Sequence, residues 1–304
     1  MPHPNNPRDS SWWGRRFRLP AISNNLRLNR SLRDVFESVD VRFGILIALL
    51  AAIPCLAQPP QPARPAGGGF REPDPIAFDD HQGYTQLFDG VSLKDWVGNP
   101  EIWRVENGAI VGESTKEKPS GNSYISYHGL VAKDFDLKFE IKVEYGGGSG
   151  IQYRSQTGIP WRRAREGQTF NLDWMMTGPQ ADYWFPVNPR SFVYTGQFYS
   201  ENTPLGILAW RGQVVQGVPG KPQTLVGNIG DRSALGGYVK INDWNQYLVM
   251  TRGGTFIHVI NGQLMAVYID DDPDSSNNKS GMVGIEIEGA PCKVSVRNIW
   301  LKKI

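Results

Sequence analysis

Polar side chains that could bind a sugar gather in one stretch of the chain, residues 192–213. It reads as two short strands joined by a polar connection, and strand side chains alternate between two faces. Tyr199 and Glu201 therefore share a face, while Trp210 and Arg211 follow on the returning strand. Sugars need hydrogen-bond partners for their hydroxyls and a flat apolar surface for their C–H faces. The stretch thus fits a polyhydroxylated ligand, and an ordinary half-exposed hairpin is the alternative.

Three side chains are candidates for proton transfer. Asp173 is the first, because a carboxylate beside an aromatic residue such as Trp174 can lose solvent and keep its proton to a higher pH. Glu201 is the second candidate acid or base, and Tyr199 can donate a hydrogen bond to an oxygen that becomes negative. Each has a plainer interpretation, as a surface acid in a turn, a solvated loop carboxylate and a packed strand tyrosine.

Two further predicted strands carry polar pairs that could bind substrate. Gln152 and Arg154 share a face, where a guanidinium can grip vicinal hydroxyls or join a structural ion pair. Glu286 and Glu288 also share a face, since residues two apart on a strand lie about 6.6 Å apart. Jelly-roll glucanases place carboxylates on alternate residues in this way, but Ile287 stands where their middle acid would be. Direct glycosidase catalysis by two flanking carboxylates is therefore not predicted.

The remaining functional residue types indicate sugar platforms rather than a metal site. Four tryptophans are candidate platforms: Trp161, Trp174, Trp184 and Trp210. The histidines His81, His128 and His258 are scattered without paired spacing, so a histidine-based metal site is not predicted. A divalent metal held by carboxylates and water stays open, and the acidic run at 270–274 is interpreted as a solvated turn. No cofactor is predicted.

Short strands and turns must position these residues. The strand 135–143 is the clearest, because apolar and charged residues alternate along its whole length. Asn107-Gly108 and Asn261-Gly262 predict tight hairpin turns, and only 173–181 could hold a short turn of helix. The other expected strands are 84–88, 103–105, 109–112, 151–154, 192–199, 207–213, 247–251, 255–260, 263–269, 283–288 and 293–302. Many short strands separated by turn residues predict an all-β sandwich or jelly roll.

The N-terminal part of the chain is predicted to lie outside this domain. Residues 43–57 form an apolar run that is short for a membrane helix and fits the hydrophobic region of a signal peptide. We therefore expect a leader at 1–57, a Pro/Gly-rich linker at 58–82 and one folded domain at 83–304. The protein is expected to be exported to the periplasm or the medium; a membrane anchor formed by 43–57 is the alternative.

Charge and cysteine content exclude two classes of protein. Removal of the leader, with eight arginines and four acids, leaves 24 basic and 26 acidic residues, so nucleic acid is not an expected partner. Cys292 is then the one remaining cysteine, and the domain must be stable without an intrachain disulfide.

An ordered set of motifs carries a family likeness from Tyr84 to Ile304. The motifs are LFDGVSLKDWVG, WRVENGAIVG, DFDLKFEIKVEYGGGSGIQYR, DWNQYLVM, HVINGQLMAVYID and VSVRNIWLKKI. Together they resemble the 3-keto-disaccharide hydrolases, also called 3-keto-glucoside lyase/hydratases. The resemblance implies a concanavalin A-like jelly roll of two antiparallel sheets, in exported proteins of bacteria that consume polysaccharides.

The resemblance also implies a reaction and a set of site residues. A base removes the C2 proton of a 3-keto-glycoside, the aglycone leaves from C1, and water adds to the enone. The family's Gly-Tyr-Gln-Ala-Asp segment is placed at 169–174, which keeps its acid as Asp173, and its Tyr-Glu-Glu-Arg run at 199–202 keeps Tyr199 and Glu201. Glu288 stands where members often carry histidine. A non-catalytic carbohydrate-binding domain is the alternative function; the expected partner is a carbohydrate, with no stable protein partner.

Overall fold

The computed structural model describes residues 72–304 except 163, 165, 167 and 186–193. The predicted leader and the first part of the predicted linker lie outside these residues. Among the described residues, no helix has the length and apolar character needed to cross a bilayer. The described chain already contacts the fold before Gly83, because Lys138 Nζ donates hydrogen bonds to the carbonyls of Ala77 and Asp80 at 2.9 and 2.7 Å.

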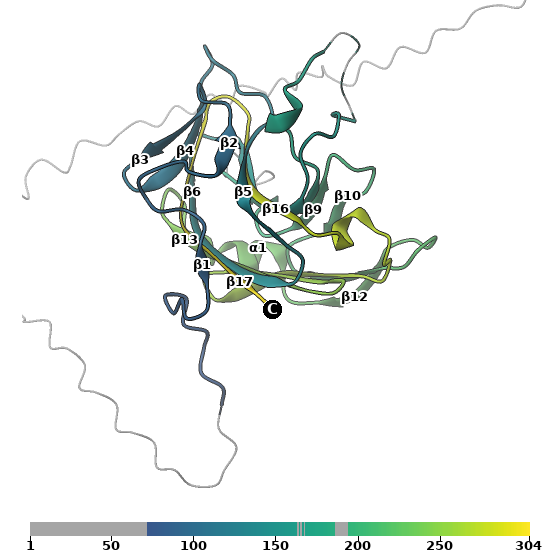
Figure 1. Cartoon of the computed structure of the whole chain (residues 1–304). Coiled ribbons are helices and arrows are strands. Elements are labelled where there is room, and N and C mark those ends of the chain that lie inside the picture. The colour runs from purple at the N-terminus through teal and green to yellow at the C-terminus, as the bar shows by residue number, and fades with distance from the viewer. Residues whose placement is uncertain (1–71, 163, 165, 167, 186–193) are drawn as a thin grey trace, which may run out of the picture. The chain divides into compact units, whose positions relative to one another are not determined.

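The fold is a jelly-roll sandwich of two largely antiparallel sheets (Figure 1). The ten-stranded sheet has the order β12(Thr224–Asn228), β11(Gln213–Gly217), β15(Gln263–Asp270), β14(Thr255–Ile260), β13(Asn245–Arg252), β6(Phe135–Glu144), β17(Cys292–Lys303), β4(Ala109–Ser114) and β3(Trp103–Glu106), with β1(Thr85–Gln86) paired to β17. The seven-stranded sheet has the order β10(Gly206–Ala209), β9(Phe198–Glu201), β8(Gly178–Trp184), β7(Gly148–Ser155), β16(Gly281–Glu288), β5(Ser123–Ala132) and β2(Trp96–Gly98). The predicted all-β fold class is confirmed.

Alternating apolar residues build the core between the sheets. Phe139 on β6 and Val249 on β13 face Ile151 on β7 and Ile285 on β16 within one buried cluster. The even-numbered residues of β6 point outward, as the alternation in the sequence predicts, although Lys138 is buried beneath the segment that it anchors. One face of each sheet is thus used for stability, and the other is available for function.

The two Asn-Gly turns are also confirmed. Asn107 and Gly108 have φ angles of 52° and 74°, and Asn261 and Gly262 have 51° and 79°, the left-handed values that a type I′ hairpin requires. Asparagine and glycine adopt this region at little cost, so the residue types alone fix these turns.

The predicted hairpin at 192–213 is only partly present. Residues 192 and 193 lie outside the described chain, and the first strand is the short β9. The predicted return strand ends at Ala209, because the chain turns at Gly212, with a φ of 93°, and enters the other sheet as β11. Trp210 and Arg211 therefore lie in the crossing between the sheets.

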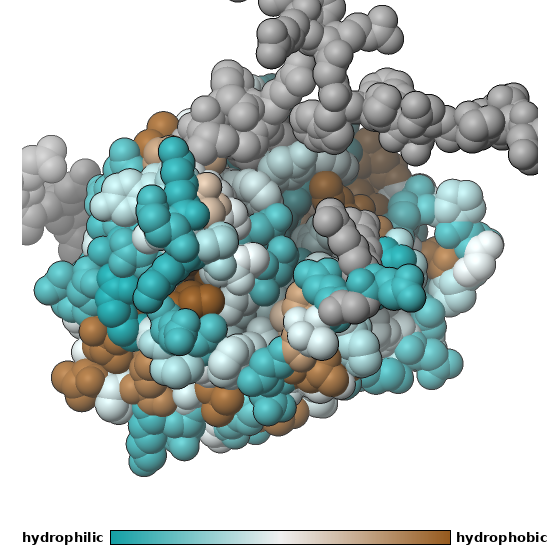
Figure 2. Space-filling model, turned by 90° about the horizontal axis from the view of Figure 1, so that it is seen from above, coloured by the Kyte–Doolittle hydropathy of each residue, from teal (hydrophilic) through white to brown (hydrophobic). Residues whose placement is uncertain are grey.

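Helices are few and short in the described residues. The segment predicted to hold a helical turn, 173–181, overlaps the 3₁₀ helix η2(Leu172–Trp174), but strand β8 occupies residues 178–181. The other described helices are α1(Arg232–Gly236) and η4(Ser276–Asn278). The face seen in Figure 2 is hollowed near its middle, where hydrophilic and hydrophobic residues both border the hollow.

Candidate functional site

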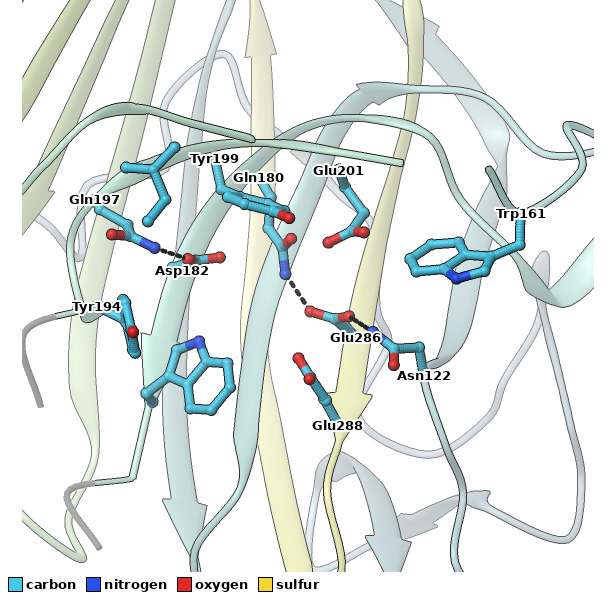
Figure 3. Close-up of a pocket in the computed structure, with 12 residues that line it drawn as sticks. Asn122, Trp161, Gln180, Asp182, Tyr194, Gln197, Tyr199, Glu201, Glu286 and Glu288 are labelled. Atoms are coloured by element: carbon cyan, nitrogen blue, oxygen red, sulfur yellow. Dashed lines mark hydrogen bonds between the residues drawn. The ribbon is translucent and has the colours of Figure 1, made fainter. Parts of the chain in front are cut away.

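A pocket of about 350 Å³ opens on the outer face of the seven-stranded sheet (Figure 3). Its lining consists of acids, amides, aromatic rings and one isoleucine: Asn122, Trp161, Gln180, Asp182, Trp184, Tyr194, Gln197, Tyr199, Glu201, Ile207, Glu286 and Glu288. The volume is near the lower end of the range of about 300–1,000 Å³ that small-molecule sites occupy. The pocket therefore suits a small polar ligand with an apolar face.

Sheet register brings two acids of β16 beside two residues of β8. On the central strand β7, Gly150 lies opposite Glu286 of β16 on one side and opposite Asp182 of β8 on the other. In the same way, Gly148 lies opposite Glu288 on one side and opposite Trp184 on the other. A Cβ atom at Gly150 would collide with the side chain of Gln180, and one at Gly148 with the indole of Trp184. The two glycines of the central strand thus create the space into which the flanking side chains extend.

Strand β9 adds the acid and the phenol that the sequence predicts to share a face. Tyr199 lies opposite Gln180, and Glu201 lies opposite Gly178. Phe198, which precedes Tyr199, points to the opposite face and belongs to the buried core cluster. The predicted shared face of Tyr199 and Glu201 is therefore confirmed, and both side chains line the pocket.

Glu286 is the most firmly held acid of the pocket. Its Oε1 accepts hydrogen bonds from Asn122 Nδ2 at 3.0 Å and Tyr124 Oη at 2.8 Å, and its Oε2 accepts one from Gln180 Nε2. Burial raises the pKa of Glu286, and these three donors act in the opposite direction. The network fixes the carboxyl group in the pocket floor.

Glu201 and Glu288 are less constrained and have different proton affinities. Burial, reinforced by the charge of Glu286, raises the pKa of Glu201 to about 9 and that of Glu288 to about 7. Glu201 Oε1 accepts a hydrogen bond from the backbone of Asn202 at 3.0 Å, whereas no described residue donates a hydrogen bond to the Glu288 carboxyl. Near pH 7, Glu201 keeps its proton, whereas Glu288 is about half ionised. Figure 3 shows their carboxyl groups extending toward the same space as that of Glu286.

Asp182 is a fourth buried carboxyl group, and its support extends into the core. Burial raises the pKa of Asp182 well above its usual range, although Gln197 Nε2 donates a hydrogen bond to Oδ2. The carbonyl of Gln197 contacts His258 Nδ1 at 3.1 Å, and His258 Nε2 contacts Tyr153 Oη at 2.8 Å. Burial lowers the pKa of His258 to about 3, so the ring is a neutral structural partner.

Aromatic residues form two walls of the pocket. Trp161 stands at one end in Figure 3 and Tyr194 at the other. The Tyr194 ring lies 5.3 Å from that of Trp184 and 5.8 Å from that of Trp210, measured between centroids. Of the four predicted platforms, Trp161 and Trp184 line the pocket, and Trp210 lies behind Tyr194.

Asp173 and Trp174 are placed outside the pocket. Both belong to η2, where Asp173 is exposed, and neither is among the lining residues. The prediction that aromatic neighbours bury the Asp173 carboxylate is wrong, because the helical turn leaves this side chain exposed to solvent. The turn itself is capped by Asn171, whose Oδ1 accepts a hydrogen bond from the backbone N–H of Asp173. Proton transfer in this pocket therefore has to involve other carboxyl groups.

Three predicted substrate-binding residues are structural instead. Arg154 has a φ of 51° beside a register shift of β16, which turns its guanidinium to the Lys133 carbonyl at 2.5 Å and to Asp134 at 3.0 Å. Gln152 is fully buried and accepts a hydrogen bond from Ser155. Arg211 is buried and donates to the Thr195 carbonyl at 2.9 Å. None of the three lines the pocket.

The acid that the sequence interpretation missed carries a recognisable signal. Gly178-Pro179-Gln180-Ala181-Asp182 differs from the family's Gly-Tyr-Gln-Ala-Asp segment only at Pro179. Its glutamine and its aspartate both line the pocket, whereas residues 169–174, where we placed the segment, do not. Asp182 thus matches the aspartate of the family segment, which we had placed at Asp173. Among the described residues, no group of three or more His, Cys, Asp or Glu side chains is arranged to hold a metal ion.

The described domain is thus a jelly-roll sandwich with an acidic, aromatic-walled pocket on one sheet. Residues 83–302 match the 3-keto-alpha-glucoside-1,2-lyase-like domain, and the chain belongs to that family. A 3-keto-disaccharide hydrolase of Bacteroides thetaiotaomicron is 35% identical over 86 residues, which cover 25% of this chain and 29% of that protein.

Solved structures with similar architecture are more distant in sequence. A proposed glycosyl hydrolase of Parabacteroides distasonis is 18% identical, with 73% of this chain and 94% of that chain covered and a TM-score of 0.45. A Bacillus subtilis protein with a galectin-like fold is 12% identical, with 72% and 94% covered and a TM-score of 0.45.

Proposed function

We propose that the protein cleaves 3-keto-glycosides, including 3-keto-disaccharides, by C2-proton abstraction, elimination of the aglycone and hydration. The observation that carries the proposal is the convergence of Glu201 and Glu288 in one pocket with pKa values of about 9 and about 7. Such a split assigns an acid and a base that work together near neutral pH.

Glu288 is the base in this mechanism. A ketone at C3 acidifies the C2 hydrogen, because the electron pair of the broken C–H bond delocalises onto the ketone oxygen as an enolate. Glu288 has no hydrogen-bond donor among the described residues, so its ionised form keeps its basicity. A base whose pKa is close to the working pH is the most effective in proton transfer.

Tyr199 and Asp182 are the groups proposed to stabilise the enolate. Both line the pocket on the side of β8 and β9. Burial keeps a proton on Asp182, so its hydroxyl can donate a hydrogen bond, as a phenol can. Donors that are already in place at the developing oxyanion lower the barrier without reorganising during the reaction.

Glu201 then completes the cleavage. As the enolate collapses, a C1–C2 double bond forms, the C1–O bond breaks, and Glu201 gives its proton to the departing oxygen. Water adds to C1 of the resulting enone, the ionised Glu201 accepts a proton from that water, and Glu288 returns its proton to C2. The net result is hydrolysis of the glycoside with the 3-keto group retained.

Export of the protein belongs to the same proposal. The apolar run at 43–57 supports a cleaved leader, and oxidised glycosides outside the cytoplasm are then the substrates. A non-catalytic carbohydrate-binding domain remains a second candidate, because Trp161 and Trp184 would stack on a sugar whether or not it is cleaved.

Solvent exchange separates the two halves of the mechanism. The purified protein is incubated with a 3-keto-disaccharide in D₂O, and deuterium at C2 and release of the second sugar are followed by NMR and mass spectrometry against an enzyme-free sample. We expect Glu288→Gln to lose both signals, and Glu201→Gln to keep exchange while releasing little sugar. Binding without exchange or release would leave the carbohydrate-binding function, and cleavage of the unoxidised disaccharide would refute the requirement for a ketone.

A further inference from the structure

A second cavity, of about 410 Å³, lies at one edge of the sandwich, near β2, β3 and β4 in Figure 1. Strand β2 is the edge strand of one sheet and β3 that of the other. The lining comes from these strands' connection, from β3 and β4, and from the β4–β5 connection: Asn99, Glu101, Ile102, Arg104, Glu113, Thr115, Lys118, Pro119 and Ser120. None of these residues lines the main pocket. The second cavity is therefore a separate space, and its volume is in the range of small-molecule sites.

A chain of four ion-paired side chains fixes one wall of this cavity. Lys293 Nζ lies 2.7 Å from Glu106 Oε1. The Arg104 guanidinium lies 2.6 Å from Glu106 Oε2 and 2.7 Å from Glu113 Oε2. Arg104 and Glu113 reach each other diagonally across the paired strands β3 and β4. Each charge in the chain is balanced by a neighbour, so the wall presents oriented hydrogen-bonding groups rather than a net charge.

Three side chains of the lining keep hydrogen-bonding capacity that no described residue uses. Asn99 Oδ1 accepts a hydrogen bond from the backbone N–H of Glu101 at 3.0 Å, whereas Asn99 Nδ2 donates to none of the described residues. Glu113 Oε2 accepts from Arg104, and Glu113 Oε1 has no described donor. Lys118 is exposed, and only its backbone groups take part in the described hydrogen bonds. The cavity thus offers an amide donor, an ammonium donor and a carboxylate acceptor to a ligand.

We propose that this cavity is a second, non-catalytic site that binds neutral, unoxidised sugars. Glu101 and Lys118 add one charge of each sign to the balanced wall, so the lining favours neither an anion nor a cation. A sugar hydroxyl both donates and accepts, which matches these polar groups, and Ile102 and Pro119 give apolar surface for C–H groups. A sugar bound here would hold the protein on a glycan without being cleaved. No proton transfer is assigned to this cavity, so the inference does not depend on the proposed function.

Methyl NMR distinguishes the two spaces, because one isoleucine lines each of them. Ile102 lines the second cavity and Ile207 the main pocket. The purified protein, labelled at the δ1 methyl groups of isoleucine, is titrated with maltose, cellobiose and trehalose, none of which carries a 3-keto group. We expect at least one of them to shift the Ile102 signal with a Kd of about 1 mM, the strength of a few hydrogen bonds in an open cavity.

Matched variants test the residues that are expected to bind the sugar. Asn99→Asp keeps the acceptor for the Glu101 N–H but removes the amide donor, and Lys118→Ala removes the ammonium donor. Each should weaken binding at Ile102 about three- to tenfold and leave the Ile207 signal unaffected. Lys116→Ala changes an exposed lysine of the same connection that does not line the cavity, and should have no effect.

Three results would overturn the second site. They are an Ile102 signal that no disaccharide moves, wild-type affinity in both Asn99→Asp and Lys118→Ala, and tighter binding of inorganic phosphate or glycine than of any sugar. Absence of turnover of a 3-keto-disaccharide, with sugar binding at Ile102 intact, would overturn only the proposed reaction.

Discussion

The dependence of activity on pH gives the sharpest test of the acid and base roles. Because Glu288 must be ionised and Glu201 protonated, kcat/KM is expected to follow a bell with limbs near pH 7 and pH 9. At pH 5 only about one Glu288 in a hundred is ionised, so the rate should fall about a hundredfold below its plateau. At pH 10 about a tenth of Glu201 remains protonated, which predicts about a tenfold loss.

Single amide substitutions should remove one limb each. Glu288→Gln is expected to lower kcat by about 10²–10⁴-fold and to abolish the limb near pH 7, and Glu201→Gln should do the same for the limb near pH 9. The assay is release of the second sugar from a 3-keto-disaccharide between pH 5 and pH 10, corrected for the enzyme-free rate. Circular dichroism at each pH excludes unfolding as the cause.

Two outcomes would refute the reasoning. An ascending limb near pH 4–5, the range of an ordinary solvated glutamate, would mean that burial does not raise the pKa of Glu288. A descending limb that persists in Glu201→Gln would mean that another group supplies the proton, and Asp182 would then be the first group to test.

Three further predictions follow from the same pocket. Gly150→Ala should lower the free energy of unfolding by about 1–3 kcal/mol, measured by urea titration, and lower kcat at least tenfold, because the new methyl group displaces Gln180. Glu201→Gln should raise Tm at pH 9 but not at pH 4. A carboxyl whose pKa is raised on folding stabilises the folded state fully below its unfolded pKa of about 4.3, and this contribution is lost as the pH rises toward about 9. Equal Tm shifts at both pH values would contradict this sign. Asp173→Asn should keep kcat/KM within about threefold, and a loss of a hundredfold would return this exposed acid to the mechanism.

Features set by neighbouring residues were predictable from the sequence. The alternation of β6, the two Asn-Gly turns and the shared face of Glu286 and Glu288 depend only on strand period and local backbone preference. These signals lead to the correct fold class and to three of the four pocket acids, Glu201, Glu286 and Glu288, together with Tyr199 on β9.

Features set by pairing between distant strands were not predictable in this way. The space in the pocket exists because Gly148 and Gly150 lie between β16 and β8, and no local pattern shows which strands flank β7. Arg154 shares a strand with Gln152, but its positive φ sends the guanidinium to a structural ion pair. Asp182 was missed because the family's Gly-Tyr-Gln-Ala-Asp segment was placed at 169–174 instead of at 178–182, where strand β8 begins.

The protonation of the pocket favours a reaction that develops negative charge on oxygen. Direct glycoside hydrolysis passes through a cation at C1 and needs an ionised carboxylate close to it. Here burial keeps protons on Asp182 and Glu201 near neutral pH, so these groups act as hydrogen-bond donors and would stabilise such a cation poorly. In the proposed reaction, the same donors stabilise an enolate, and Glu288 is the base that forms it. The protonated carboxyl groups of Asp182 and Glu201 therefore suit the enolate of the proposed reaction better than a cation.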